Sequence, residues 1–151
     1  IAFLGFDYMT IMFIYAINQF YQFFLHTEMI GKLPSWYEAI FATPSHHRVH
    51  HASNIKYLDK NMGQVLIIWD KIFGTFQEEE EAPKYGLTKP LNTVNPFKAI
   101  VSEHIKIIDD LKKPVSLADK WNYIFKAPGW SHDGSTKTSD QLRNEQTIHA
   151  R

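Results

Sequence analysis

Four of the eight histidines of this chain lie within six positions, at His46, His47, His50 and His51. Imidazole nitrogen is a ligand that suits zinc, copper, iron and nickel. Successive residues of an α-helix are about 100° apart around its axis, so all four rings project from one side if this segment is helical. The pairs His46/His50 and His47/His51 have the i,i+4 spacing at which side chains meet. The segment therefore predicts a helix that binds one metal ion or two neighbouring ions.

The residues that precede the histidines favour a helix. Thr43 is a good N-cap and Pro44 is a good first helical residue. The alternative is a solvated helix face that carries histidines by chance, but clustering at ligand spacing makes metal binding the preferred interpretation. The chain contains no cysteine, which excludes thiolate ligands and disulfides and fits a reducing compartment.

An apolar run over residues 1–25 carries one formal charge, Asp7. About 20 apolar residues suffice to cross a bilayer, so the run predicts a membrane-spanning helix; the alternative is a buried helix of a soluble protein. The chain has 151 residues, one domain's worth, and begins at Ile1 without methionine, so we interpret it as a piece of a longer protein. Its 16 basic and 16 acidic residues form no basic stripe, and no nucleic-acid partner is expected.

The polar residues of this run share one side of a helix. Five of them fall within an arc of about 100° on a helical wheel: Asp7, Tyr15, Asn18, Gln22 and His26. Polar groups in a membrane helix usually face a bundle interior or a cavity, although interhelical hydrogen bonding also explains such a stripe. His26 lies where the helix would leave the membrane, so it joins the candidate ligands. Basic residues begin only at Lys32, which places the later region on the cytoplasmic side.

The remaining patterns predict further helices. Residues 34–41 form an amphipathic piece with the interfacial anchors Trp36, Tyr37 and Phe41. Residues 63–73 predict a short buried helix that ends at Gly74, and residues 78–81 are a solvated acidic run. Helices are expected over residues 96–112 and 117–126, after the caps Asn95 and Ser116. The predicted fold is therefore an all-α, integral membrane helical bundle over residues 1–130, followed by a polar, disordered tail over 131–151.

Several segments, in this order, resemble the fatty acid hydroxylase/sterol desaturase superfamily. They are Gln22-x-x-x-His26-Thr27, Thr43-Pro44-Ser45-His46-His47-Arg48-Val49-His50-His51, Asp59-Lys60-Asn61 and Trp69-Asp70-Lys71-Ile72-Phe73-Gly74-Thr75-Phe76. The histidine segment alone is shared widely, whereas the ordered set is far more specific. The resemblance implies a membrane-embedded, all-helical oxygenase with a histidine-rich di-iron site at its cytoplasmic face.

The resemblance also implies roles for particular residues. His26, His47, His50 and His51 are expected to bind metal directly, and His46 is expected to bind metal or to support a ligand. Three residues are expected to orient ligand imidazoles, namely Gln22, Asn54 and Asp70, with loop or cap chemistry as the alternative for the last two. Arg48 is expected to bind an anionic headgroup or to be solvated. Further histidine motifs of the family are expected before Ile1, and the fragment alone is predicted to be inactive.

The implied reaction is O2-dependent oxidation of a lipid C–H bond at two iron ions. Within the family, the resemblance implies hydroxylation of an alkylglycerol beside its ether oxygen, with collapse of the hemiacetal to an aldehyde and glycerol, and tetrahydropterin as a possible electron donor. A fatty acyl or sterol hydroxylase or desaturase of the same superfamily stays open. So do a zinc hydrolase, although no His-Glu-x-x-His motif occurs, and a non-redox membrane protein that binds or transports metal.

Overall fold

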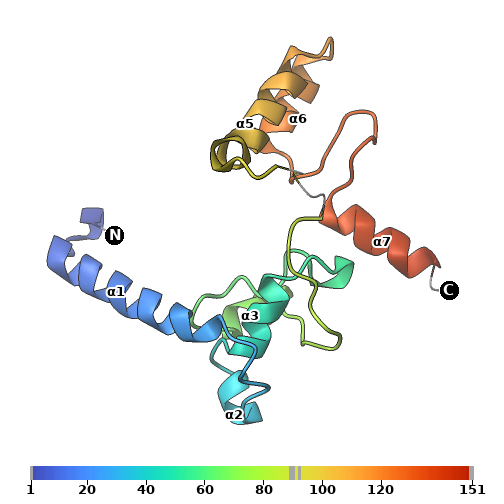
Figure 1. Cartoon of the computed structure of the whole chain (residues 1–151). Helices are drawn as coiled ribbons and strands as arrows, with labels where there is room; N and C mark the ends of the chain where they lie inside the picture. Colours follow the sequence, from blue (N-terminus) through green and yellow to red (C-terminus); the bar gives the residue numbers. More distant parts are fainter. Residues whose placement is uncertain (1, 89–90, 92, 150–151) are drawn as a thin grey trace. The chain divides into compact units, whose positions relative to one another are not determined.

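The structure is a computed structural model that describes residues 2–88, 91 and 93–149 (Figure 1). The chain divides into two compact units, Ile1–Gly86 and Leu87–Arg151, which are described separately below. Regular secondary structure in the described residues is helical, and two isolated β-bridges pair Phe41 with Leu66 and Ala52 with Tyr85. The prediction of a helical fold is confirmed at this level.

Helix α1 spans Tyr8–Leu25 and follows a separate 3-10 turn, η1, at Ala2–Leu4. Gly5 has a φ of 88°, and Asp7 caps α1 by accepting hydrogen bonds from the Thr10 N–H at 3.0 Å and the Thr10 hydroxyl at 2.5 Å. The predicted continuous helix over residues 1–25 is therefore wrong, because this cap starts a new helix of 18 residues. No helix in the described ranges combines the length and the hydropathy that crossing a membrane requires.

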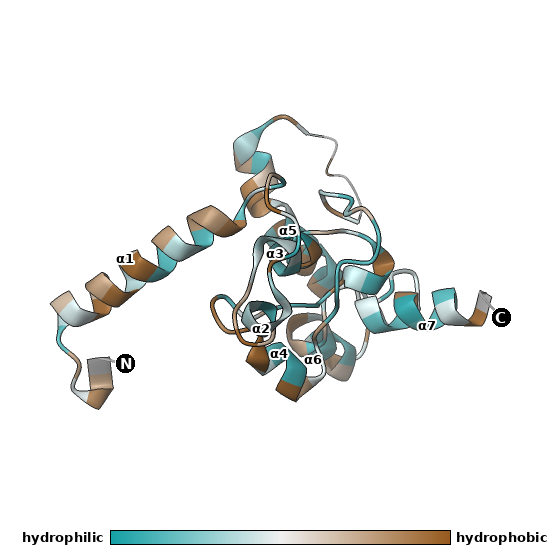
Figure 2. Cartoon of the chain, turned by 90° about the horizontal axis from the view of Figure 1, so that it is seen from below, coloured by the Kyte–Doolittle hydropathy of each residue, from teal (hydrophilic) through white to brown (hydrophobic). Residues whose placement is uncertain are grey.

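Helix α1 exposes many apolar side chains and is mostly brown in the hydropathy colouring of Figure 2. Its second half is fastened to other segments of the first unit. Asn18 Nδ2 donates to Gln64 Oε1 at 3.1 Å, and the Tyr21 hydroxyl donates to the Ala42 carbonyl at 2.5 Å. Asn18, one residue of the predicted polar stripe, thus forms a hydrogen bond between two segments, as the alternative interpretation of the stripe expected. These contacts hold the end of α1, and with it His26, beside the histidine segment.

The histidine segment forms helix α3, Pro44–His50, with Thr43 at its N-cap position and His51 at its C-cap position. Pro44 begins the helix as predicted. The Thr43 hydroxyl does not cap the helix but donates to Glu38 Oε1 at 3.0 Å, at the end of the short helix α2, Ser35–Glu38. The buried face of α3 packs through Val49 onto Ala52 and Tyr57, the last of these in the 3-10 turn η2, Ile55–Tyr57. One face of α3 is thus fixed by the core.

Helix α4 covers Ile68–Phe73, which is shorter than the predicted helix over residues 63–73. The residues directly before it form bends and an isolated bridge, because the Ala42 N–H donates to the Val65 carbonyl at 2.8 Å, beside the bridge between Phe41 and Leu66. A Cβ atom on Gly63 would lie 2.6 Å from the Leu66 carbonyl oxygen, so only glycine permits this approach. Gly74 ends α4 with a φ of 73°, as predicted.

Three of the four glutamates of the acidic strap, Glu78–Glu81, are exposed, as predicted for a solvated run, whereas Glu79 is half-buried. Each of its four glutamates contacts a partner from an earlier segment: Lys32 with Glu78 at 3.1 Å, Arg48 with Glu79 at 2.6 Å, Lys56 with Glu80 at 3.0 Å, and Asn54 with Glu81 at 2.9 Å. The Tyr57 hydroxyl also accepts from the backbone N–H groups of Glu80 and Glu81. The strap is therefore fixed across the segments that carry the histidines.

The second unit contains α5 (Pro96–Lys112), α6 (Leu117–Phe125) and α7 (Ser139–His149). Asn95 accepts from two N–H groups at the start of α5, and Ser116 Oγ accepts from the Asp119 N–H at 3.1 Å, which confirms both predicted caps. Helices α5 and α6 contact each other. Helix α7 lies in the stretch that the sequence analysis expected to be a polar tail.

Candidate metal centre

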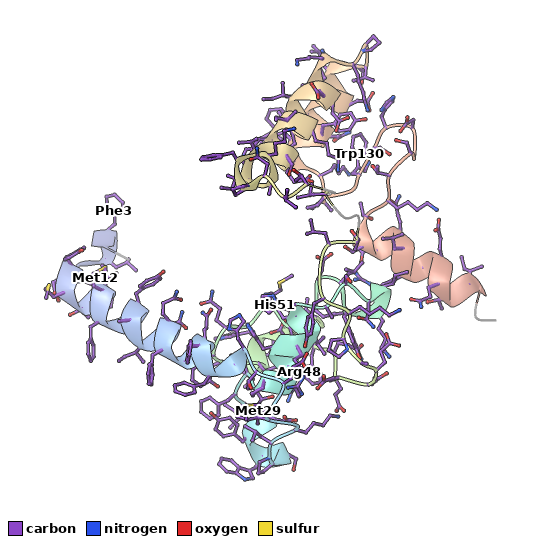
Figure 3. The ribbon with its side chains drawn as sticks, viewed as in Figure 1. Phe3, Met12, Met29, Arg48, His51 and Trp130 are labelled. Atoms are coloured by element: carbon purple, nitrogen blue, oxygen red, sulfur yellow. The ribbon has the colours of Figure 1, made fainter. Side chains whose placement is uncertain are left out.

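Three histidine rings of the first unit converge through their Nε2 atoms. His47 Nε2 lies 2.9 Å from His26 Nε2 and 3.0 Å from His51 Nε2, and the His26 and His51 Nε2 atoms are 3.2 Å apart. His26 caps the C-terminus of α1, whereas His47 and His51 come from α3 and its C-cap (Figure 3). Two segments that are separate in the sequence therefore bring three nitrogen donors to one point.

Hydrogen bonds on the far side of two rings determine which nitrogen is free. His26 Nδ1 lies 2.8 Å from the Gln22 carbonyl oxygen, and His50 Nδ1 lies 3.4 Å from the Lys60 carbonyl oxygen. Because a carbonyl oxygen can only accept, the neutral tautomer that fits these contacts carries its proton on Nδ1 and leaves the lone pair on Nε2. Hydrogen bonds of this kind orient metal-binding imidazoles.

The three Nε2 atoms cannot all be satisfied by hydrogen bonds to one another, since each nitrogen of a neutral ring either donates or accepts. A shared cation resolves this. At the usual metal–imidazole bond of about 2.0–2.1 Å, three ligands on one face of an octahedron lie about 3.0 Å apart, and tetrahedral ligands about 3.4 Å apart. The observed 2.9–3.2 Å fits the octahedral face, which non-haem iron oxygenases use with further positions left open.

The environment of His47 and His51 keeps these two rings neutral. Burial, reinforced by the neighbouring rings of His26, His51 and His50, lowers the pKa of His47 to about 3. Burial and the His50 ring also lower the pKa of His51. A metal ligand must be deprotonated, so these lowered pKa values favour metal binding over protonation near neutral pH.

The lowered pKa of His47 predicts a pH dependence of stability in the metal-free protein. The unfolded chain binds a proton on His47 near its usual pKa of 6.5, whereas the folded chain does so only near 3. The contribution of neutral His47 is thus complete above about pH 6.5 and is lost as the pH falls toward 3. We expect the free energy of unfolding, measured with urea in the presence of chelator, to fall less steeply from pH 6.5 to 4 in His47→Gln. Equal slopes for His47→Gln and the wild type would contradict the assignment.

The structure does not place all five predicted ligands together. The His50 ring lies beside the converging rings, with its centroid 5.0 Å from that of His51. His46 is buried elsewhere: its Nε2 lies 4.0 Å from Glu38 Oε2, and its ring packs edge-on against Phe76. His46 is therefore not part of the three-histidine cluster, and the predicted pair His46/His50 does not act as a unit.

Comparison with known proteins bears on this cluster. A family model described as fatty acid hydroxylase matches residues 1–75, which include all three converging histidines and His50. The chain belongs to the fatty acid hydroxylase family. No solved structure matches the chain.

Three similar proteins are alkylglycerol monooxygenases. The Homo sapiens protein is 47% identical over 121 residues, covering 78% of this chain and 27% of that protein. The Xenopus tropicalis protein is 45% identical over 113 residues (75% and 25%), and the Danio rerio protein is 40% identical over 137 residues (87% and 30%). The chain thus spans about a quarter to a third of the length of these relatives.

Three further residues of this fatty acid hydroxylase family member, Gln22, Asn54 and Asp70, were expected to orient the metal-binding imidazoles. The Gln22 backbone carbonyl oxygen lies 2.8 Å from His26 Nδ1, so Gln22 contacts a candidate ligand through its backbone, and its orienting role stays a prediction. Asn54 instead contacts the segment after the strap, accepting from the Lys84 N–H at 2.7 Å. Asp70 accepts from the N–H groups of Met62 and Gly63, both at 2.7 Å. Among the contacts of the described residues, neither Asn54 nor Asp70 touches an imidazole, which favours the loop and cap alternative for both.

Sequence reasoning gave no supporting role to Asn61, although it lies in the Asp59-Lys60-Asn61 segment of the family resemblance. Its side chain is buried and donates to the His46 carbonyl at 3.1 Å and the Gln77 carbonyl at 2.8 Å. Its φ of 53° is one that asparagine tolerates better than most residues. Asn61 therefore ties α3 to the segment that leads into the acidic strap.

Proposed function

We propose that the full-length protein is a membrane-bound, O2-dependent di-iron monooxygenase that hydroxylates an alkylglycerol beside its ether oxygen. The observation that carries the proposal is the approach of three Nε2 atoms to within 2.9–3.2 Å of one another. Its family and its similarity to alkylglycerol monooxygenases support the same reaction. In the proposal His26, His47 and His51 hold one iron, and His50 serves the second together with histidine motifs elsewhere in the full-length protein.

The proposed reaction balances with one external reductant. Iron, when bound, supplies the two-electron activation of O2 and the insertion of one oxygen atom into a C–H bond. The second oxygen atom leaves as water after taking up two electrons and two protons, and tetrahydropterin is the proposed electron donor. The hemiacetal then breaks its carbon–oxygen bond to give an aldehyde and glycerol. The chain's own contribution is to keep His47 and His51 neutral through burial, which lowers the pKa of both, and to orient His26 through the Gln22 carbonyl.

A pocket of about 360 Å³ beside the histidines is suited to the headgroup of such a lipid. Its lining includes Glu28, Tyr85, the three converging histidines and Arg48, whose positive charge is paired with Glu79. Partial burial and a hydrogen bond to Glu28 raise the pKa of Tyr85, so its phenol stays neutral. A carboxylate accepts hydrogen bonds from hydroxyl groups and repels phosphate. The pocket therefore favours a neutral, hydroxyl-bearing headgroup, as a glyceryl ether has.

The apolar exterior of α1 supports a membrane location for the full-length protein. Its exposed side chains include Phe13, Ile17 and Phe20, and Trp36 on α2 is also exposed. Aromatic residues of this kind are enriched where a protein meets the membrane interface. In the proposal these surfaces contact lipid, the alkyl chain of the substrate lies along the membrane, and the metal centre faces the cytoplasm.

The test is to supply the full-length protein with iron, tetrahydropterin and a 1-O-alkylglycerol. We expect fatty aldehyde to form only in the presence of O2. Hydroxylation of a fatty acyl or sterol substrate with a protein reductant, without aldehyde from the ether, would retain the oxygenase and reject the ether substrate. Full function with zinc and no O2 uptake would instead support a hydrolase or a transport protein.

A further inference from the structure

Arg48 follows the candidate ligand His47 and joins three segments of the first unit. Its Nε and Nη2 atoms donate to the two carboxylate oxygens of Glu79 at 2.7 and 2.6 Å. Its Nη1 atom donates to the carbonyl oxygens of Thr27 at 3.0 Å and Ile30 at 2.8 Å. The side chains of Arg48 and Glu79 are only 12% and 17% exposed. With four hydrogen bonds inside the protein, this guanidinium is not the solvated side chain of the alternative expectation. Arg48 also lines the pocket beside the histidines, so a contact with a headgroup stays a prediction.

The two carbonyl contacts concern the backbone that carries His26. Helix α1 ends at Leu25, so Thr27 and Ile30 lie beyond its last turn and outside its hydrogen-bond ladder. Thr27 directly follows His26, just as Arg48 directly follows His47. Arg48 therefore links the neighbour of one candidate ligand to the neighbour of another. The His26 and His47 Nε2 atoms that must share a metal are 2.9 Å apart.

We propose that Arg48 is a positioning residue of the metal centre: its guanidinium fixes the turn after α1, and hence His26, against α3, while Glu79 holds the guanidinium in place. The inference rests on the proposed function only in requiring that the histidines bind a metal. Arginine suits this role because its planar fork donates in several fixed directions at once, whereas the single ammonium of lysine does not. Pairing with a carboxylate through two parallel hydrogen bonds also sets the orientation of the fork.

The same strap provides a matched control. Lys56 pairs with Glu80 at 3.0 Å, but these side chains are 33% and 58% exposed, and Lys56 lies in η2. Within the part of the chain that the structure describes, the Lys56 ammonium contacts Glu80 and the Tyr57 ring, neither of which is a backbone group next to a candidate ligand. Loss of this ion pair should therefore affect the strap without moving His26.

The experiment compares Arg48→Lys with Lys56→Gln in the full-length protein. Co2+ affinity is measured by competition with a chelator, the visible absorption of bound Co2+ reports ligand geometry, and the thermal midpoint of the metal-free protein reports folding. We expect Arg48→Lys to weaken Co2+ binding roughly 10- to 100-fold, the range for residues that orient ligands, and to alter the spectrum. Lys56→Gln should change neither. Wild-type affinity and spectrum in folded Arg48→Lys would overturn the inference.

A double-mutant cycle tests whether Arg48 acts through His26. In a His26→Ala background, His47 and His51 alone hold Co2+ weakly, and the affinity is measured at raised Co2+ concentration. There Arg48→Lys should weaken Co2+ binding less than about twofold further, because the residue that it positions is gone. Full additivity would overturn the inference, since it would indicate a general structural effect. If Arg48→Lys does not fold, Glu79→Gln tests the same Arg48–Glu79 pair and should show the same non-additivity with His26→Ala. If the wild type does not bind metal, the proposed function itself is rejected. If the wild type binds Co2+ and neither Arg48→Lys nor Glu79→Gln changes its affinity, only this inference is rejected.

Discussion

Replacing His47 by alanine in the full-length protein is expected to abolish iron loading and to lower turnover by more than about a hundredfold. That factor exceeds the 10- to 100-fold cost of losing a residue that merely supports a ligand. His47 Nε2 is the atom common to the two shortest distances in the cluster, 2.9 Å to His26 and 3.0 Å to His51. Without it, the remaining two nitrogens are 3.2 Å apart and cannot define a three-ligand face. Iron per chain and product formation are the measurements.

Two other histidines serve as controls for this result. His132 bonds to the Tyr123 hydroxyl at 2.7 Å in the second unit, and His132→Ala should leave iron content and turnover unchanged. His46→Gln is the sharper control, because His46 is the neighbour of His47 but contacts Glu38 and Phe76. We expect it to lower stability while the folded protein keeps its iron. Normal iron content in His47→Ala, or iron loss in His46→Gln equal to that in His47→Ala, would contradict the cluster as described.

The second large effect is on stability. Asp70→Ala is expected to lower the free energy of unfolding by about 3 kcal/mol or more, because hydrogen bonds to a charged group contribute roughly 1.5–3 kcal/mol each and their loss leaves buried donors unpaired. The Asp70 side chain is 2% exposed and accepts from the N–H groups of Met62 and Gly63 and from the Thr75 hydroxyl, at 2.6–2.7 Å. Chemical denaturation measures the change.

Asp109 on α5 provides the matched control, since its carboxylate is exposed and pairs with Lys112 at 3.1 Å. Asp109→Ala should change the free energy of unfolding by no more than about 0.5 kcal/mol. The folded fraction of Asp70→Ala should bind metal as the wild type does, because Asp70 contacts loop donors. Metal binding weakened 10- to 100-fold in that fraction would show instead that Asp70 orients a ligand.

The sequence by itself determined the local features of this protein. Pro44 at the start of α3, the caps Asn95 and Ser116, and the glycine that ends α4 are found where they were predicted. Each depends on backbone conformation and hydrogen bonds within a few residues, which neighbouring residue types specify. The family was also accessible from the sequence, because its motifs are short and ordered.

Only the tertiary structure decided which histidines meet. On a helical wheel His46 and His50 lie within about 40° of each other, and His47 and His51 lie about 100° further around on average. Helix geometry alone therefore permitted all four histidines to bind at one metal site. Packing of Val49 into the core turned α3 so that His47 and His51 face His26 while His46 faces Glu38 and Phe76.

The partners of these residues lie far along the chain. His26 and His47 are 21 positions apart, Arg48 and Glu79 are 31 apart, and Lys32 and Glu78 are 46 apart. Periodicity and capping describe how one segment folds on itself, but they do not specify which segments pack together. The charge pattern of the strap was therefore visible in the sequence, whereas its role in holding the histidine segments depends on contacts that form only when the chain is folded.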